Sequence, residues 1–218
     1  VSEEGLNAYG ATTWGQFFIY QGFNEKTGWM HTSTGTDIID EFKETIVKTN
    51  DKTHYTYGEK MLPVDSIQVS LNYATNTGTS SKDFTLFRTH HGPITHSEGI
   101  HWISTALMWS PIKALKQSFT RTKKSNHNEF HEMMDIRTNS SNNTVYADAD
   151  GTIAYYHGNF IPVRDEKFDY TKPVDGSNPA TDWKGLHKLE ENIFVKNPPT
   201  HWIQNCNSTP FSSAAEYS

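Results

Sequence analysis

The sequence predicts an α+β fold that is rich in strands and carries a small helical insertion. Short runs of aromatic and β-branched residues alternate with polar ones in the first half of the chain and return after Asn139. Helical spacing of apolar residues is confined to the stretch between them. Strands and helices do not alternate regularly, so parallel βαβ units are not indicated. Aromatic residues make up 13% of the 218 residues, and they are expected to build much of the core.

The first 109 residues are expected to be strand-rich. Ile67, Val69 and Leu71 alternate with polar residues, which is the period of a half-buried strand. Residues 83–89 repeat this pattern after a turn rich in Gly, Ser and Thr at residues 76–82. Other strands are expected at residues 14–20, 40–49, 53–57 and 100–108, with a turn at residues 22–26 and an extended segment from Trp29.

Two helices are expected within residues 110–137. Ser110 followed by Pro111 indicates a helix start, because a hydroxyl cap precedes a proline in the first turn. Asn126 with Glu129 three residues later indicates a second start. The apolar residues expected on the packed faces are Ile112, Leu115 and Phe119 in the first helix and Phe130, Met133 and Met134 in the second.

Strands and long loops are expected over residues 138–218. The segment DADG at residues 148–151 lies between two strand-like runs and predicts a hairpin. It also resembles the start of a calcium-binding loop, but no glutamate stands at the closing position, so a plain turn is favoured. Residues 165–183 are expected to form a long polar loop.

Charge and composition exclude several classes of partner. The formal net charge is −6 and no basic stripe is present, so a nucleic-acid partner is not expected. No apolar run is long enough to span a bilayer. Cys206 is the only cysteine, which excludes an internal disulfide. Because the chain starts at Val1, we expect it to be a processed or truncated part of a longer polypeptide.

Two stretches are weak candidates for a metal site. Asp37 and Asp40, three residues apart, could bind a hard cation with a backbone carbonyl, although a solvated turn is favoured by spacing alone. His90, His91 and His96 invite a zinc interpretation. Adjacent residues of a strand point to opposite faces, and no cysteine or carboxylate accompanies them at zinc spacing, so zinc is disfavoured.

The stretch WIQNCNSTP, residues 202–210, gathers hydrogen-bonding groups. Gln204, Asn205 and Asn207 supply three carboxamides around Cys206. Such a set suits a site that orients a substrate or holds a developing charge, and the competing interpretation is an Asn-rich turn. Cys206 has no nearby signature of a nucleophile, and a buried thiol is the commoner fate of such a residue.

Four stretches together resemble the β-chain of the penicillin amidase family, which includes acyl-homoserine lactone acylases. The stretches cover most of the chain. They are GFNEKTGWMHTSTGTDIIDEF from Gly22, FRTHHGPI from Phe87, VYADADGTIAYYHGNFIPVR from Val145, and TDWKGLHKLEENIFVKNPPTHWIQNCNSTP from Thr181.

The resemblance implies an N-terminal-nucleophile hydrolase with a four-layer αββα sandwich. Members cleave an acyl group from an amide, here a penicillin-like or acyl-homoserine-lactone-like small molecule. A serine exposed by self-cleavage of a precursor attacks the amide, with its own α-amino group as base. The resemblance also implies a periplasmic or secreted protein, whose partners are the α-chain and the remaining β-chain of the same precursor.

Matching the motifs position by position implies roles for six residues. Asn207 stands where the family has the carboxamide of the oxyanion hole, and Asn205 is the other asparagine of that motif. Ser33 stands where a backbone N–H supplies the second oxyanion donor. Calcium is implied at the carboxylates of Asp37 and Asp40 and the carbonyl of Ile39, and the resemblance makes this cation site the favoured interpretation.

The match departs from the family at the nucleophile. Ser2 is too close to Gly22 and follows Val1, so no nucleophile is expected in this chain, which alone should be inactive. Phe23 replaces a common histidine and Met30 a glycine, and both changes could reshape the acyl pocket. Two alternatives stay open: a homologue that has lost catalysis and binds ligands, and an unrelated strand-rich or carbohydrate-binding module.

Overall fold

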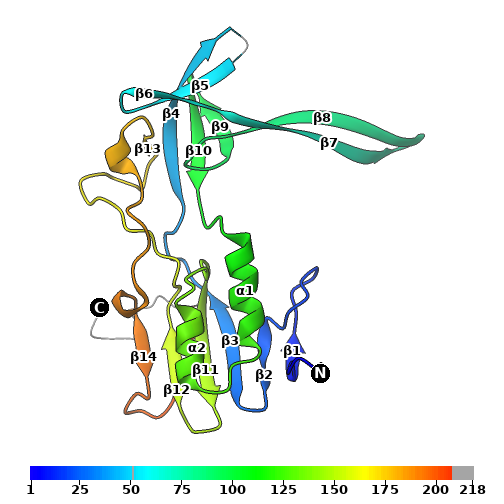
Figure 1. The fold of residues 1–218 in the computed structure, drawn as a ribbon, viewed down its shortest axis with the longest axis vertical. Coiled ribbons are helices and arrows are strands. Elements are labelled where there is room, and N and C mark those ends of the chain that lie inside the picture. The colour runs from blue at the N-terminus through cyan, green and yellow to red at the C-terminus, as the bar shows by residue number, and fades with distance from the viewer. Residues whose placement is uncertain (51, 208–218) are drawn as a thin grey trace. The chain divides into compact units, whose positions relative to one another are not determined.

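A computed structural model describes residues 1–50 and 52–207 (Figure 1). The chain divides into two compact units, each assembled from separate stretches. The first unit comprises residues 1–38, 108–163 and those from 185 onward, and the second comprises residues 39–107 and 164–184. Strands make up most of the secondary structure of both units, and the α-helices of the described residues lie in the first, so the predicted strand-rich α+β class is confirmed.

The first unit contains a six-stranded antiparallel sheet in the order β1-β2-β3-β11-β12-β14. The strands are β1 (Ala8–Ala11), β2 (Gln21–Asn24), β3 (Thr27–Ser33), β11 (Asn142–Asp148), β12 (Ile153–Tyr156) and β14 (Phe194–Lys196). A 3₁₀ turn, η2 (Leu189–Glu191), precedes β14. The hairpin of β11 and β12 is the one predicted around DADG. Its turn uses Asp148 as an internal acceptor, because Oδ1 receives the N–H groups of Asp150 and Thr152 at 3.1 and 2.9 Å.

The two predicted helices are present as α1 (Pro111–Arg121) and α2 (His127–Met134), and they contact each other. The side chain of Asn126 caps α2 by accepting the N–H of Glu129 at 3.0 Å. The Glu129 carboxylate accepts the N–H of Ser125 in return, also at 3.0 Å. Satisfying these donors at the helix start fixes where α2 begins.

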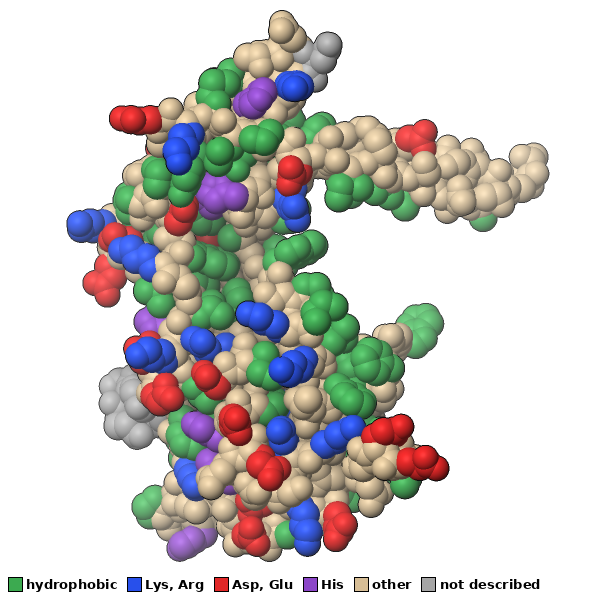
Figure 2. Space-filling model, viewed as in Figure 1, with side chains coloured by type: hydrophobic (Ala, Val, Ile, Leu, Met, Phe, Trp, Pro, Cys, Tyr) green, Lys and Arg blue, Asp and Glu red, His purple; other side chains and the backbone are tan. Residues whose placement is uncertain are grey.

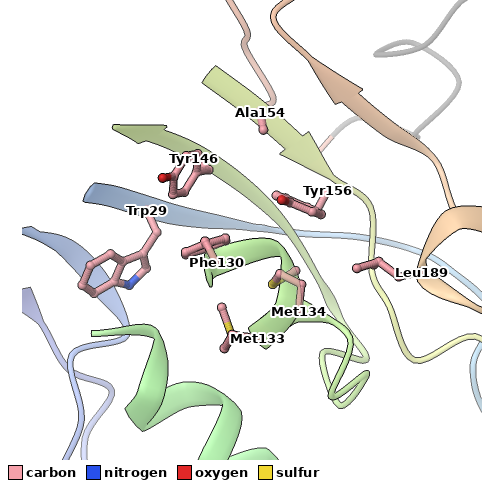
Figure 3. Close-up of a cluster of buried hydrophobic side chains, with 8 residues drawn as sticks. All are labelled: Trp29, Phe130, Met133, Met134, Tyr146, Ala154, Tyr156 and Leu189. Atoms are coloured by element: carbon pink, nitrogen blue, oxygen red, sulfur yellow. The ribbon is translucent and has the colours of Figure 1, made fainter. Parts of the chain in front are cut away.

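The core of the first unit lies between α2 and the sheet (Figure 3). Phe130, Met133 and Met134 project from one face of α2, as the sequence predicts, onto aromatic side chains of β3, β11 and β12. These strand residues are Trp29, Tyr146 and Tyr156, each at most 3% exposed. Aromatic side chains therefore fill much of this core, a position that aliphatic side chains occupy in most proteins.

The expectation that the apolar stripe of α1 is buried is wrong for Ile112 and Leu115, whereas Phe119 is half-buried. Ile112 is 77% exposed and Leu115 is 39% exposed, whereas Gln117 and Arg121 are the buried residues of this helix. Gln117 accepts the backbone N–H of Thr138 at 2.8 Å. Because polar partners compensate the cost of burial, a polar face can pack inward, and the spacing of apolar residues does not reveal this.

A strand at residues 14–20 was also expected, and this prediction is wrong. Gly15 has a φ of +83°, and the N–H of Gln16 bonds to the carbonyl of Thr13 at 2.9 Å, which makes a turn. Trp14 and Phe17 are 102% and 70% exposed. Within the described part of the chain no strand pairs with this aromatic run, so its β propensity is not realised and the local turn decides its conformation.

The second unit contains a sheet in the order β6-β5-β4-β10-β9, with the short β13 parallel to β4. Its strands are β4 (Asp40–Thr49), β5 (Lys52–Tyr57), β6 (Lys60–Pro63), β9 (Ile94–Glu98), β10 (His101–Ala106) and β13 (Val174–Asp175). Phe42, Ala106 and Val174 form its small core. The predicted polar loop contains β13 and a 3₁₀ turn, η1 (Pro179–Thr181).

A long two-stranded arm completes the second unit. β7 (Asp65–Thr75) and β8 (Gly78–Arg88) pair along their whole length, from Asp65 with Arg88 to Thr75 with Gly78. The predicted turn at residues 76–82 therefore shrinks to two residues. Hydrophobic side chains follow one edge of the arm (Figure 2). The exposed hydrophobic residues of β7 and β8 include Ile67, Leu71, Phe84 and Leu86.

No helix of the described residues has the length and apolar character needed to cross a membrane.

Candidate functional site

The loop that carries Asn205 and Asn207 is fastened to the sheet of the first unit. Asn205 is buried, and its Oδ1 accepts three hydrogen bonds. The donors are Oγ1 of Thr32 at 2.5 Å, Nδ2 of Asn143 at 3.3 Å and the backbone N–H of Asn207 at 3.1 Å. Because Thr32 lies near the end of β3 and Asn143 near the start of β11, one carboxamide oxygen holds the loop against two neighbouring strands.

Asn143 extends this network into the interior. Its Nδ2 also lies 3.3 Å from Oγ1 of Thr32, so its Oδ1 faces the other way and accepts from Nδ1 of His157 at 2.9 Å. Nε2 of His157 lies 2.7 Å from Oγ1 of Thr36, which in turn lies 2.9 Å from Oγ1 of Thr34. The amide orientation follows from its partners, since the two acceptors on one side require the amide nitrogen there and the oxygen on the other side.

The directions of these bonds are consistent with a neutral network. A neutral His157 that donates at Nδ1 must accept at Nε2, so the Thr36 hydroxyl donates to it and accepts from Thr34. Burial lowers the pKa of His157, which keeps the ring neutral. Asn143 is fully buried, and all of its donors and its acceptor are used. A satisfied network of this kind holds its members in one geometry.

Asn207 and Ser33 both lie beside this network. Asn207 is exposed, with a φ of +62°, a left-handed conformation that asparagine tolerates better than most residues. Ser33 ends β3 and is also exposed. The bond from Thr32 to Asn205 therefore brings the segments of Ser33 and Asn207 to the same end of the sheet. The rest of the predicted stretch, residues 208–210, lies outside the described residues.

A second polar cluster joins α1 to the sheet. Nε2 of His31 accepts from Nη1 of Arg121 at 2.5 Å, and Nδ1 of His31 lies 3.0 Å from Oγ1 of Thr144. Burial, and then the charge of Arg121, hold the pKa of His31 well below its usual range. Burial also lowers the pKa of Arg121 to about 10. This cluster explains why the inward face of α1 is polar.

In the second unit, one carboxylate oxygen of Asp40 accepts hydrogen bonds and the other accepts none from the described residues. Asp40 is 1% exposed. Its Oδ2 accepts from Nε of Arg164 at 2.7 Å and from Nε1 of Trp183 at 2.5 Å. Its Oδ1 is buried and has no hydrogen-bond partner among the described residues. Asp37 and Ile39 are exposed. A buried, unsatisfied carboxylate oxygen is a suitable ligand for a hard cation.

Sequence reasoning missed Thr32, Asn143 and His157. Asn143 belongs to a polar run that has no apparent function when read along the chain. It lies in β11 on the face opposite to that of Tyr146, so the aromatic pattern of the core gives no signal for it. Buried polar side chains in such a strand must find partners across the sheet, and these partners are distant in sequence.

Comparisons with known proteins agree with this architecture. The profile of the penicillin amidase family matches residues 1–218. Penicillin G acylase of Escherichia coli is 27% identical over 210 residues, covering 94% of this chain and 24% of that protein. This chain thus spans about a quarter of the length of that curated relative. The structure of a thermostable penicillin G acylase from Alcaligenes faecalis is similar in fold, with a TM-score of 0.80 and 22% identity over 96% of this chain and 38% of that one.

Proposed function

This chain belongs to the penicillin amidase family, and we propose that it supplies part of the acyl-transfer site of an N-terminal-nucleophile amidohydrolase. The proposed reaction removes an acyl group from a small penicillin-like or acyl-homoserine-lactone-like amide. The nucleophilic serine would lie upstream of this chain, in the same precursor. Family membership supports the hydrolase class, and it makes an unrelated carbohydrate-binding module untenable. A homologue that has lost catalysis is the alternative that the experiment below tests.

The observation that carries the proposal is the hydrogen bond from Thr32 to Asn205. It joins the strand end that carries Ser33 to the loop that carries Asn207. In the proposed mechanism, attack on the amide carbonyl places negative charge on its oxygen. The carboxamide N–H of Asn207 and the backbone N–H of Ser33 would donate to that oxyanion. Donors held in place before the reaction do not need to reorganise as the charge develops.

The test is the turnover of the complete processed protein on a chromogenic acyl amide. Asn207→Ala removes one donor that acts mainly in the transition state, so kcat should fall about a hundred- to a thousandfold, with a much smaller change in KM. Ser33→Ala is the matched control, because a backbone donor survives loss of the side chain. Equal turnover of Asn207→Ala and the wild type would refute the proposed role, and an inactive wild type would favour the homologue without catalysis.

We also propose a calcium site that includes Asp40, with Asp37 and the carbonyl of Ile39 as further ligands. The unused oxygen of Asp40 supports this proposal, since a cation would satisfy it. Calcium bound only to the native state should raise the Tm of the complete protein. Chelation should reverse the increase, and Asp37→Ala should abolish it. The site would be excluded if neither chelation of calcium nor Asp37→Ala changed the Tm.

The proposed setting is periplasmic or secreted, with the α-chain and the remaining β-chain of the precursor as partners. Family membership is the support for this part of the proposal.

A further inference from the structure

His90 and His91 lie beside each other, contrary to the expectation that they point to opposite faces of a strand. β8 ends at Arg88, and the two histidines follow in a bend that is not part of any strand. Gly92 closes the bend with a φ of +154°, where a Cβ would lie 2.0 Å from the carbonyl oxygen of Thr105. The alternation of strand side chains does not apply here, and the two imidazole rings lie with their centroids 3.8 Å apart.

Both rings direct a nitrogen at one oxygen of Asp182, a residue some ninety positions further along the chain. Nε2 of His91 lies 3.0 Å from Oδ1 of Asp182, and Nε2 of His90 lies 3.7 Å from the same atom. One ligand atom from each of the three side chains lies within 4.8 Å of the others. We propose that His90, His91 and Asp182 bind a divalent transition-metal ion of the Zn²⁺ type. Ligands about 2.0–2.2 Å from a tetrahedral zinc ion lie roughly 3.3 Å from one another, close to the 3.0 and 3.7 Å that separate the two histidine nitrogens from Asp182.

The groups behind the three ligands hold them in the orientation that a metal requires. Nδ1 of His91 faces Oε1 of Glu44 at 2.9 Å, and Nδ1 of His90 faces the hydroxyl of Tyr55, also at 2.9 Å. The second oxygen of Asp182 accepts the hydroxyl of Tyr57 at 2.5 Å. Histidine ligands characteristically bond to a carboxylate or another polar group through the nitrogen that does not bind the metal.

The charge balance of the cluster also favours a cation. Glu44 is fully buried, and its Oε1 accepts from Thr89 and Ser104 as well as facing His91. No lysine or arginine within residues 1–50 and 52–207 forms an ion pair with Glu44 or Asp182. Two carboxylates so placed need positive charge nearby.

The cluster is open to solvent on one side. The side chains of His90 and Asp182 are 34% and 31% exposed, whereas that of His91 is 5% exposed. An ion can enter from that side, and water or a substrate group can take the fourth position. Phe42 stacks on the ring of His91 with centroids 3.9 Å apart, so the inner ligand has little freedom. The arrangement is that of three protein ligands with one open coordination position.

Zinc binding by the complete protein tests the proposal. The protein is stripped with a chelator, saturated with Ca²⁺ to occupy hard-cation sites, and titrated with Zn²⁺ by calorimetry. His90→Gln removes the exposed ligand and should lower the affinity of one zinc site per chain more than tenfold. His96→Gln is the matched control, because His96 lies on β9 outside the cluster, and it should bind as the wild type does. Equal binding by the wild type and His90→Gln would overturn the proposal.

A second measurement distinguishes a site of defined coordination geometry from nonspecific binding to surface histidines. Co²⁺ bound by two imidazoles and a carboxylate in a four-coordinate site should give strong visible absorption that His90→Gln removes. Glu44→Gln should weaken zinc binding by about ten- to a hundredfold, as loss of an outer partner commonly does. Should Glu44→Gln fail to fold, His90→Gln still decides, because its side chain is partly exposed. Absorption that survives in His90→Gln would contradict the assignment.

Discussion

The network around Asn205 in the first unit and the cluster around Glu44 in the second unit differ in charge. In the first unit, Asn205, Asn143 and His157 form a chain of neutral carboxamides, hydroxyls and an imidazole whose bonds match donor to acceptor. In the second unit, Glu44 and Asp182 place two carboxylates around His91, and Oε2 of Glu44 is buried without a hydrogen-bond partner among the described residues.

The comparison distinguishes two kinds of buried polar network. A neutral, fully satisfied network costs little to bury and fixes geometry, which suits a loop that must present Asn207 in one position. A charged network with an unused acceptor depends on whatever supplies the missing positive charge. We therefore expect the first network to respond mainly to changes of shape, and the second to changes of charge and to added cations.

The largest effect on stability is expected from Glu44→Ala. The change leaves His91, Thr89 and Ser104 without their shared acceptor in a closed interior. Each buried donor left unsatisfied costs about 1–3 kcal/mol, so losing an acceptor that three donors share should cost several kcal/mol. Denaturant unfolding of the complete protein, followed by hydrogen exchange of β4 and β10, should locate this loss in the second unit. A loss below about 1 kcal/mol would show that Glu44 is dispensable there.

A smaller loss is expected from Asn143→Ala. It leaves Nδ1 of His157 without its acceptor and removes one of the donors to Asn205. Each buried group left unsatisfied costs about 1–3 kcal/mol. Because the loop of Asn207 loosens, kcat should also fall, by up to about a hundredfold, as small misplacements can cause. A stability loss with unchanged kcat would separate the network from the proposed site.

The pH dependence of the first unit sharpens the comparison. Burial lowers the pKa of His157 and of His31 in the folded state, while the unfolded histidines titrate near about 6.5. The unfolded chain therefore binds more protons below that pH, so stability is present above it and is lost as the pH falls toward the folded values. His157→Gln should give a shallower fall of Tm on acidification than the wild type. An identical slope would mean that His157 is not buried as a neutral ring.

The smallest effect is expected from Lys43→Gln, which serves as the surface counterpart of Glu44→Ala. Lys43 and Glu98 form an ion pair at 3.2 Å with both side chains at least 40% exposed. Exposed pairs of this kind contribute about 0.2–1 kcal/mol. Unfolding in denaturant should detect little change, and the small remainder should vanish in high salt. A loss as large as that of Glu44→Ala would undermine the distinction between buried and exposed charge.

Local patterns along the chain determined which elements form. The alternation around Ile67 predicted β7, the Asn126 and Glu129 pair predicted the start of α2, and the DADG segment predicted the hairpin of β11 and β12. These features depend on neighbours within a few residues, whose chemistry can be read directly. The motif resemblance likewise pointed to the family and to the segments of Ser33 and Asn207, whose proposed roles stay predictions until turnover is measured.

Tertiary structure alone decided which faces and which distant side chains meet. Nothing local to α1 indicates that Gln117 and Arg121 turn inward, because their partners Thr138 and His31 come from other elements. The same holds for Asn143, which finds Asn205 across 62 positions, and for His91, which reaches Asp182 across 91. Hydrogen bonds and ion pairs act over about 3 Å of space regardless of separation along the chain, so the sequence supplied the chemical groups and the fold determined their partners.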